Sequence, residues 1–506
     1  MRVTNHMVTS SSLRNMQKSM QRVSRLNDQV TSGKKISAPS EDPVVAIRAL
    51  KLRTTCDQLD QYKNKNIKDA LSWLDTTQSS IENILSRMQS VYEYAEQGAN
   101  DTFSTGDRNK IINELRSLKD GIYSEGGTTY AGRYLFSGYK TETNLIFQNE
   151  AAKNGMAYSI TEELSPDKIR SKSVVLNEIN VDNLDGILED GDPYTSPTRA
   201  NAYTLQLAYD KLDKGALNGN DLSIVATDKD GNTITLPTMT VMSVADSADY
   251  YNVGAEEIHF IPETGEIVFG DDIYESIKKA QNLTVNYNKS DFAVGDLRPE
   301  MYFNCTQYKE EADGSVKTTE YTVTDEGQPI RYEVNFNQYI TVNAEGRNII
   351  THDIGNDIDD MATAVQNVLD IESAIQKLKG YLSDPKYMDD EDAVEQINKM
   401  LEDADVELAM KREDMQKLFG RNMTNFQNFM NDVSAQQAIV GTNYSKLELI
   451  ETRVIEQLDN FKELKSSNED IETEEAALEL YQAELVYESA LATTSNVVQK
   501  TLLDYL

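Results

Sequence analysis

Stripes of mostly apolar residues run through both ends of the chain. Residues spaced alternately three and four apart share one face of a helix, and an apolar face must be buried against a partner. The N-terminal stripe is Leu13, Met16, Met20, Val23, Asn27 and Val30. The C-terminal stripe is Ile471, Leu478, Tyr481, Leu485, Ala492, Val498 and Leu502. These stripes predict two terminal helices that pack on each other and on neighbouring copies of the chain.

A second long helix is predicted to follow the first. Asp42 suits the N-cap position and Pro43 suits the first helical turn, where a missing N–H costs nothing. No proline or glycine lies between Pro43 and Gly98, which predicts a helix over about 44–97. Its apolar seam changes phase between Leu59 and Ile67. A shorter helix is predicted over about 111–122.

The pattern changes in the middle of the chain. Residues 222–236 and 258–269 predict hairpins, the first with its turn at Asp230-Gly231. Short strands are also predicted at 283–287, 300–305, 320–323 and 330–336, and one helical patch at 202–212. The middle of the chain therefore predicts a mostly-β domain inserted between helical arms.

Helical periodicity returns at about residue 357 and stops at Asp384-Pro385. The most regular heptad pattern of the chain then runs from Phe426 to Phe461, and Ser466-Ser467-Asn468 interrupts it before the terminal helix. Each helical arm carries a seam that it cannot bury alone, so the two arms should pack together.

We expect three parts. Residues 1–40 and 466–506 form a terminal coiled-coil layer, residues 41–147 and 351–465 a helical bundle rod domain, and residues 148–350 an outer, mostly-β domain. Polar residues interrupt both terminal stripes, and weakly striped helices are marginal without a partner. The terminal layer is therefore expected to be frayed or disordered in the free monomer.

The distribution of charge along the chain bears on the partners and on the pairing of the two ends. The formal net charge of −35 argues against nucleic acid and membrane as partners of the whole molecule. Residues 1–65 carry 12 bases and 5 acids, whereas residues 446–506 carry 14 acids and 5 bases. Opposite signs favour pairing of the two ends. The alternative is that both charged surfaces are merely solvated helix faces.

No constellation of catalytic residues stands out. The three histidines, His6, His259 and His352, have no partners at metal-ligand spacing, and no phosphate-binding glycine loop occurs. Residues 228–232 fit a hairpin turn better than a calcium loop. We therefore expect that the protein is not an enzyme and that it binds neither a metal ion nor a cofactor. The absence of a signal-like or membrane-spanning apolar run by itself predicts a cytoplasmic protein.

Several stretches together resemble the hook-associated members of the bacterial flagellin family. These stretches are Val30–Leu50 (VTSGKKISAPSEDPVVAIRAL), Gly132–Gly138 (GRYLFSG), Gly295–Phe303 (GDLRPEMYF), Val440–Glu448 (VGTNYSKLE) and Ala490–Leu506. The resemblance covers about 140 residues at the start of the chain and about 150 at its end.

The resemblance implies an elongated, flagellin-like α+β fold, in which the long N- and C-terminal helices form a coiled-coil bundle and the β domain projects outward. It also implies a structural adaptor that joins the hook to the flagellin filament. The implied partners are other copies of the chain in a ring, the hook-associated protein FlgK, flagellin, and an export chaperone on the C-terminal helix. Export through the flagellar type III apparatus needs no cleaved signal, so the expected location is extracellular rather than cytoplasmic.

Two alternatives remain. Flagellin itself is the nearest relative of this group, but Asp42-Pro43-Val44-Val45 and the Leu503–Leu506 ending favour the junction protein. The second alternative is a ligand-binding or enzymatic outer domain carried on a coiled-coil stalk.

Overall fold

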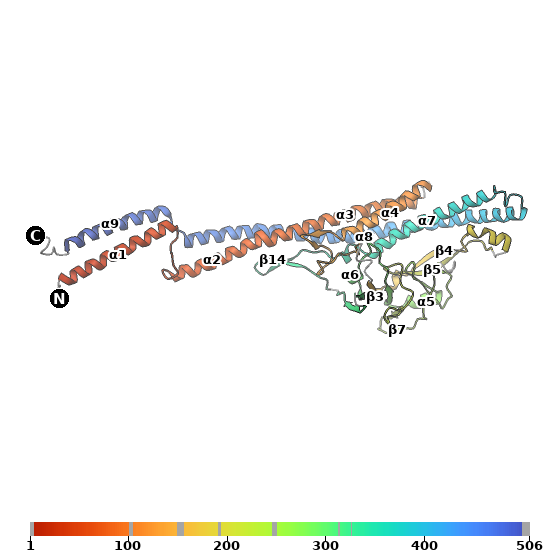
Figure 1. The fold of residues 1–506 in the computed structure, drawn as a ribbon, viewed down its shortest axis with the longest axis horizontal. Coiled ribbons are helices and arrows are strands. Elements are labelled where there is room, and N and C mark those ends of the chain that lie inside the picture. The colour runs from red at the N-terminus through yellow and green to blue at the C-terminus, as the bar shows by residue number, and fades with distance from the viewer. Residues whose placement is uncertain are drawn as a thin grey trace. The chain divides into compact units, whose positions relative to one another are not determined.

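Long helices precede and follow a β-rich insertion (Figure 1), which confirms the predicted α+β class. The computed structural model describes residues 5–100, 105–148, 156–190, 194–244, 250–311, 314–324 and 326–497. The long helices are α1 (Asn5–Ser32), α2 (Pro43–Gln61), α3 (Lys68–Ala99), α4 (Thr105–Glu125), α7 (His352–Tyr381), α8 (Glu391–Glu469) and α9 (Thr473–Val497).

The chain divides into two compact units. The terminal unit consists of Met1–Leu71, Arg331–Ile340 and Ser445–Leu506, and the central unit of Ser72–Ile330 and Thr341–Tyr444. The three-part division into terminal layer, rod and outer domain stays a prediction.

In the terminal unit, α2 begins where the sequence predicts. The Asp42 carboxylate accepts hydrogen bonds from the backbone N–H groups of Val44 and Val45, at 3.0 and 3.1 Å. Pro43 occupies the first turn, where it needs no hydrogen-bond acceptor.

The predicted change of phase in the long helix is a π-helical segment, η1 (Tyr62–Ile67), between α2 and α3. A π-turn contains one extra residue, so the side chains of the following helix are rotated about the helix axis. Leu59 and Ile67, both fully buried, are consequently eight residues apart rather than seven.

A hairpin of the insertion packs on this segment. It consists of β14 (Arg331–Asn335) and β15 (Gln338–Thr341). The Asn66 amide donates to the Glu333 carbonyl at 2.7 Å, and the Tyr62 hydroxyl donates to the Glu333 carboxylate at 3.1 Å. The hairpin therefore binds the exposed polar groups of the wider turn.

Two sheets form the part of the insertion that belongs to the central unit. One has the strand order β13-β12-β3-β11-β6-β7 and the other β4-β5-β10-β9-β8. The pairs are antiparallel except β8–β9, which is parallel. The strands are β3 (Met156–Leu164), β4 (Arg170–Leu176), β5 (Thr198–Gln206), β6 (Ser223–Thr227), β7 (Thr233–Ile234), β8 (Thr240–Val241), β9 (Ile258–Ile261), β10 (Glu266–Phe269), β11 (Asn282–Lys289), β12 (Asn304–Glu310) and β13 (Val316–Tyr321).

Short elements complete the described fold. A two-stranded hairpin, β1–β2, precedes the insertion. The short elements are β1 (Thr129–Tyr130), β2 (Arg133–Tyr134), η2 (Pro166–Lys168), η3 (Val181–Asn183), η4 (Gly186–Asp190), α5 (Asp271–Ile277), α6 (Pro299–Tyr302) and η5 (Gly346–Asn348).

Both predicted hairpins are confirmed, as β6–β7 and β9–β10. The helical patch predicted at 202–212 is wrong, because β5 occupies Thr198–Gln206. Its odd and even positions face two different cores: Leu205 lies in the core of the insertion and Ala202 in a smaller cluster. A strand buried on both faces has no polar alternation, so its pattern resembles that of a buried helix.

The strand predicted at 300–305 is also wrong over its first residues. Pro299 starts the short helix α6, and β12 begins only at Asn304. Proline in the first helical turn favours this outcome.

Ion pairs attach the insertion to the helices of the central unit. Lys168 and Arg170 pair with Asp353 and Asp357 on α7. Arg199 on β5 pairs with Glu413 on α8 at 2.8 Å. Asp353 and Asp357 lie four residues apart on one face of α7, so both can bind bases from the segment that leads from η2 into β4.

Glu162 on β3 is a buried carboxyl group whose hydrogen-bond partners lie in the core of the insertion. Its side chain is 6% exposed and accepts hydrogen bonds from the Tyr287 hydroxyl at 2.8 Å and the Ala208 N–H at 3.1 Å. Burial disfavours the charged form and raises the pKa of Glu162 to about 7.

The substitution Glu162→Gln should therefore remove a pH dependence of stability. The native state holds a proton that the unfolded chain releases, so the free energy of unfolding falls as pH rises from 4.5 to about 7. We expect a loss of about 2 kcal/mol across this range in the unmodified chain and a flatter profile in the variant. Trp73, the sole tryptophan and fully buried in the central unit, reports unfolding. Glu163→Gln, at the exposed neighbouring position, should leave the profile unchanged; equal profiles for all three chains would contradict this assignment.

Candidate assembly interface at the paired chain ends

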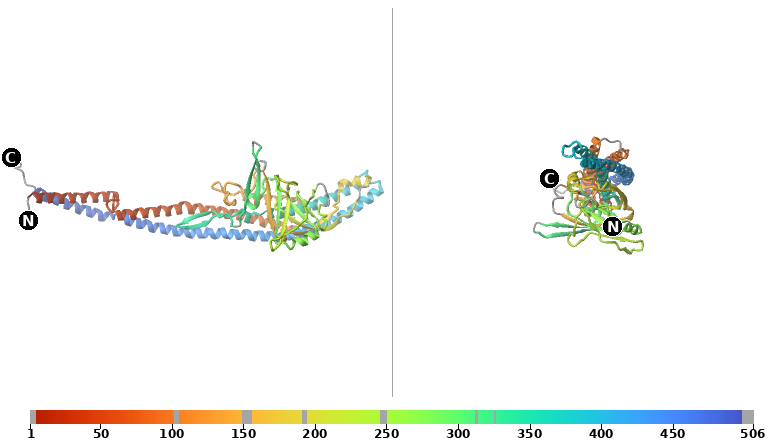
Figure 2. Two further views of the ribbon diagram at one scale, coloured as in Figure 1. Left: turned by 90° about the horizontal axis from the view of Figure 1, so that it is seen from below. Right: turned by 90° about the vertical axis from the view of Figure 1, so that its right-hand side faces the viewer.

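The two terminal helices pair in the terminal unit, as the sequence predicts. Helix α9 runs alongside α1 in opposite direction, in both views (Figures 1 and 2). The contact stripe of α1 repeats every three and four residues: Thr9, Ser12, Met16, Ser19, Val23, Leu26 and Val30. Leu26, only 3% exposed, is its most buried member.

The contact stripe of α9 combines four small residues with two large ones. It consists of Ala476, Leu480, Ala483, Tyr487, Ala490 and Thr494. The three alanines recur every seven residues, and Ala483 is 5% exposed. Small side chains let two helices approach closely, so their packing compensates for the modest apolar area of each side chain.

The predicted interface residues are not all found in this contact. Met16, Val23 and Val30 are half-buried and lie on the α1 contact stripe. Leu13 and Met20 are 42% and 58% exposed and lie beside it. Only three of the five therefore contribute to the contact between α1 and α9, and the prediction that all five belong to an assembly interface stays a prediction.

The same holds for α9. Leu478, Tyr481 and Leu485 are 59%, 66% and 57% exposed, on the face opposite the contact with α1. Ile471 is half-buried in the linker before α9, and Val498 and Leu502 lie outside the described residues. The heptad of alanines is the signal that sequence reasoning missed, because large apolar residues were given more weight. Contact of the predicted residues with neighbouring copies stays a prediction.

The opposite charges of the two ends do not meet along the helices. Exposed bases on α1 are Arg14, Lys18, Arg22 and Arg25, and exposed acids on α9 are Glu474, Glu475, Glu479, Glu484 and Glu488. No ion pair joins α1 to α9 within residues 5–32 and 473–497 as described. The direct attraction is instead concentrated where α1 and α8 end: Lys34 and Asp470 lie in linkers, Arg53 on α2 and Glu469 at the last position of α8.

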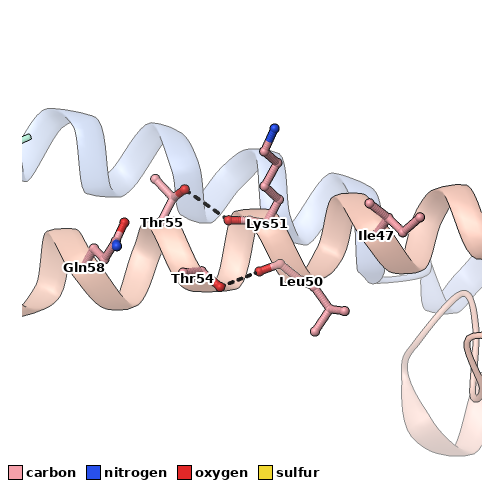
Figure 3. Close-up of a pocket in the computed structure, with 6 residues that line it drawn as sticks. All are labelled: Ile47, Leu50, Lys51, Thr54, Thr55 and Gln58. Carbon is pink, nitrogen blue, oxygen red and sulfur yellow. Dashed lines mark hydrogen bonds between the residues drawn. The ribbon is translucent and has the colours of Figure 1, made fainter.

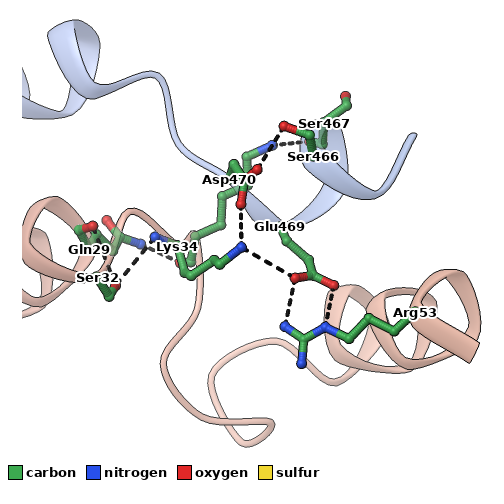
Figure 4. A network of polar contacts seen from close by, with 9 residues as sticks. Gln29, Ser32, Lys34, Arg53, Ser466, Ser467, Glu469 and Asp470 are labelled. Atoms are coloured by element: carbon green, nitrogen blue, oxygen red, sulfur yellow. Dashed lines mark hydrogen bonds and ion pairs between the residues drawn. The ribbon is translucent and has the colours of Figure 1, made fainter. Parts of the chain in front are cut away.

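We call this cluster the clasp: Lys34, Arg53, Glu469 and Asp470 (Figure 4). Arg53 donates two hydrogen bonds to the Glu469 carboxylate, at 2.6 and 2.7 Å. Lys34 contacts Asp470 at 2.5 Å and Glu469 at 3.5 Å. Glu469 is buried at 4% exposure, so its charge depends on these partners.

Backbone hydrogen bonds fix the same two linkers. The Lys35 N–H donates to the Glu469 carbonyl at 2.7 Å, and the Ile471 N–H donates to the Gly33 carbonyl at 3.1 Å. Gly33 ends α1 at φ +70°, where glycine has no steric penalty. The two helix breaks that the sequence predicts, after α1 and after α8, thus pair with each other.

The clasp shifts the pKa values of its members. The hydrogen bonds from Arg53 lower the pKa of Glu469, and the hydrogen bond from Lys34 lowers that of Asp470. The hydrogen bond to Asp470 raises the pKa of Lys34. Opposite charge favours the ionised forms on both sides.

A second exposed surface lies on α2 in the terminal unit. Val44, Ile47 and Leu50 are 67%, 67% and 63% exposed, although the buried face of the same helix carries the small residues Ala46 and Ala49. A shallow groove runs along this outer face, lined by Ile47, Leu50, Lys51, Thr54, Thr55 and Gln58 (Figure 3).

The histidines are structural where the structure describes them. His352 lies among the rings of Tyr209, Tyr302 and Phe303, and burial lowers its pKa to about 3. His259 contacts the Tyr250 carbonyl at 3.1 Å. Among the described residues, no group of His, Cys, Asp or Glu is arranged to hold a metal ion, and no described helix has the length and hydropathy to cross a membrane.

Comparison with known proteins finds a family match for the N-terminal region. Residues 3–141 match the bacterial flagellin N-terminal helical region. Over these residues the chain is similar to the flagellin family. Flagellar hook-associated protein 3 of Escherichia coli K12 is 26% identical over 208 residues, which are 40% of this chain and 64% of that protein. The corresponding protein of Salmonella typhimurium is 28% identical over 171 residues, 32% of this chain and 52% of that protein.

The chain thus spans between half and two thirds of these relatives' length. Phase 2 flagellin of Salmonella abortus-equi is 25% identical over 268 residues, 51% of this chain and 50% of that protein. The solved FlgL structure of Xanthomonas campestris has a TM-score of 0.30 at 11% identity and covers 83% of this chain and 99% of that one. The hook-associated protein-3 structure of Legionella pneumophila has a TM-score of 0.31 at 12% identity, with coverages of 82% and 97%.

The substitution Glu469→Gln should loosen the paired chain ends. It removes the charge that binds Arg53 and Lys34, which are both about half exposed, so we expect a cost of about 1 kcal/mol after solvent screening. Amide-exchange protection of α9 should fall about five-fold. Glu472→Gln, an exposed linker position, is the matched control and should have no effect.

The clasp also predicts acid sensitivity. Because Glu469 and Asp470 have lowered pKa values when folded, their contribution is complete above their ordinary pKa values of 4.5 and 3.8 and is lost as pH falls through the folded values. The difference between the Glu469→Gln variant and the unmodified chain should therefore shrink below pH 4. A difference that persists in acid would contradict the charge-based explanation.

Proposed function

We propose that this chain is a structural adaptor at the hook–filament junction of the bacterial flagellum, where it joins the hook, through FlgK, to the flagellin filament. The flagellin N-terminal region and the relatives named hook-associated protein 3 support this assignment. The observation that carries it is the construction of α9: one stripe is buried against α1, and a second stripe of large apolar residues is uncovered.

A protein that functions as a monomer has no need for a second apolar stripe that is exposed to solvent. Leu478, Tyr481 and Leu485 are each more than half exposed, and a continuous exposed apolar surface marks an interaction site. A ring of copies would bury these side chains. The same surface suits the export chaperone before assembly, because a helix-binding groove recognises apolar residues at this spacing.

The remaining partners follow from this location. FlgK lies on the hook side and flagellin on the filament side. Export through the flagellar type III apparatus makes the protein extracellular. We assign no enzymatic activity, since the described histidines are buried among core groups or stand on exposed helix surface.

A filament subunit is the second candidate, and the flagellin relatives favour it. The phase 2 flagellin match extends over more of this chain than either hook-associated match does. A filament subunit polymerises without limit, whereas a junction protein stops at one short layer. Overproducing this chain in a strain that lacks flagellin separates the two: long filaments would support the filament subunit.

Deleting the gene in its own bacterium tests the adaptor role. We expect hooks without filaments, together with flagellin monomers in the medium, because flagellin has no surface on which to begin. Electron microscopy of the cells and assay of the medium provide the readout, and a plasmid copy of the gene is the control. Normal filaments in the deletion strain would refute the proposal.

The free monomer provides a further prediction. The residue ranges 1–40 and 466–506 should be frayed or disordered before assembly, because small, weakly striped helices are marginal without a partner. Amide exchange in a verified monomer should show measurable protection there that is far weaker than the protection of α3 and α8. Strong protection of both ends would be incompatible with this view.

A further inference from the structure

The uncovered stripe of α9 is regular and carries charge at both ends. Its members are Glu474, Leu478, Tyr481, Leu485, Glu488 and Ala492, spaced alternately four and three apart. Neither glutamate forms an ion pair within the described residues. A helix that docks through this face would present three large apolar side chains between two carboxylates.

Helix α2 carries a stripe with the complementary character. Val44, Ile47, Lys51, Thr54 and Gln58 follow the same spacing on its outer face, and Leu50 flanks them. The Thr54 hydroxyl donates to the Leu50 carbonyl at 2.9 Å and the Thr55 hydroxyl to the Lys51 carbonyl at 3.0 Å (Figure 3). Because both hydroxyls are satisfied within α2, the floor of the groove is more apolar than its sequence suggests.

We propose that the outer stripe of α2 is the docking surface for the outer stripe of α9 from a second copy of this chain. The inference rests on the proposed function in that an assembly supplies many copies. Apolar residues match in number, with Val44, Ile47 and Leu50 facing the three large residues of α9. Arg48 and Lys51 supply positive charge beside the groove, and neither has an ion pair among the described residues.

Helix α1 is the other candidate to receive this stripe, and its outer face does not fit. Arg14, Lys18, Arg22 and Arg25 occupy that face, so a docked α9 would leave its leucines against charged side chains. Desolvating four bases for two glutamates is unfavourable. The α2 surface provides both apolar contact and matching charge.

A single helix-on-helix patch of this size is weak by itself. It falls below the area of a stable interface between two free proteins. In an assembly, each copy gives one stripe and receives another, so many weak contacts act together. This geometry is head-to-tail, which generates a ring or a helical array rather than a closed pair.

Mixed-variant cross-linking tests the contact directly in the full chain. Ile47→Cys and Tyr481→Cys are prepared separately, since both positions are exposed. The native Cys56 and Cys305 are buried, and the unmodified chain is the background control. At millimolar concentration under mild oxidation, a disulfide-linked dimer should form in the mixture of the two variants and not in either alone.

Two further variants give matched controls. Leu449→Cys on α8 is similarly exposed, at 71%, and Arg22→Cys lies on the basic face of α1. Neither should cross-link to Tyr481→Cys. Equal or faster cross-linking to Arg22→Cys, self-cross-linking of Tyr481→Cys, or no dimer with Ile47→Cys would overturn the proposed contact.

Charge reversal tests the electrostatic part. Lys51→Glu and Glu488→Lys should each weaken association about five-fold, as measured by sedimentation. The mixture of the two should recover most of the loss. Circular dichroism checks that both exposed substitutions leave the fold intact. No recovery in the mixture would refute the pairing of these two stripes.

The experiments distinguish failure of the proposed contact between α2 and α9 from failure of the proposed function. If the deletion strain lacks filaments but the Ile47→Cys and Tyr481→Cys chains never cross-link, the adaptor role stands and this contact is wrong. If filaments form normally without the gene, the adaptor role falls, whatever the cross-linking shows.

Discussion

The close packing of α1 on α9 through small side chains is the contact on which the terminal unit depends. Alanines at every seventh position bring the two backbones together, and only a narrow stripe of each helix is buried. This choice determines the rest of the surface. Leu480 and Tyr487 share the inner face with the alanines, but Leu478, Tyr481 and Leu485 face outward, so α9 carries apolar residues on two faces.

The clasp secures this packing at the end where it would otherwise open. Two helix breaks far apart in sequence meet, and their linkers exchange backbone hydrogen bonds and charges. Glu469 is buried and Arg53 is half exposed, so the carboxylate is the member that cannot lose its partner without cost. A pair of weakly striped helices that is marginal alone thereby gains a defined register.

Much of this fold follows from local sequence rules. Asp42-Pro43 marks the start of α2, glycine and serine mark the ends of α1 and α8, and alternating strands with Asp230-Gly231 mark a hairpin. These signals work because each depends on a few neighbouring residues. The phase change before Ile67 likewise predicted a rotation, although not its cause, since a π-turn leaves no signature in composition.

The failures share a different origin. Periodicity shows that a helix has a face, but it does not show which of two faces meets the neighbouring helix. Leu478, Tyr481 and Leu485 have the larger apolar area, yet Ala476, Ala483 and Ala490 make the contact. In the strand β5, burial on both faces removed the alternation that identifies a strand. Both outcomes depend on long-range contacts, which a single segment does not encode.

Helix α2 also buries small side chains and exposes larger ones in its first turns. There the buried face uses Ala46 and Ala49, whereas Val44, Ile47 and Leu50 face outward; further along the helix, Leu59 is buried. A helix selected only for the stability of its own chain would place them the other way round, because burying a large apolar side chain contributes roughly 1.5–3 kcal/mol. The terminal unit repeats this inversion on α9. On both helices, large apolar residues are exposed that could have been buried within the chain. Contacts that form only between copies best explain this placement.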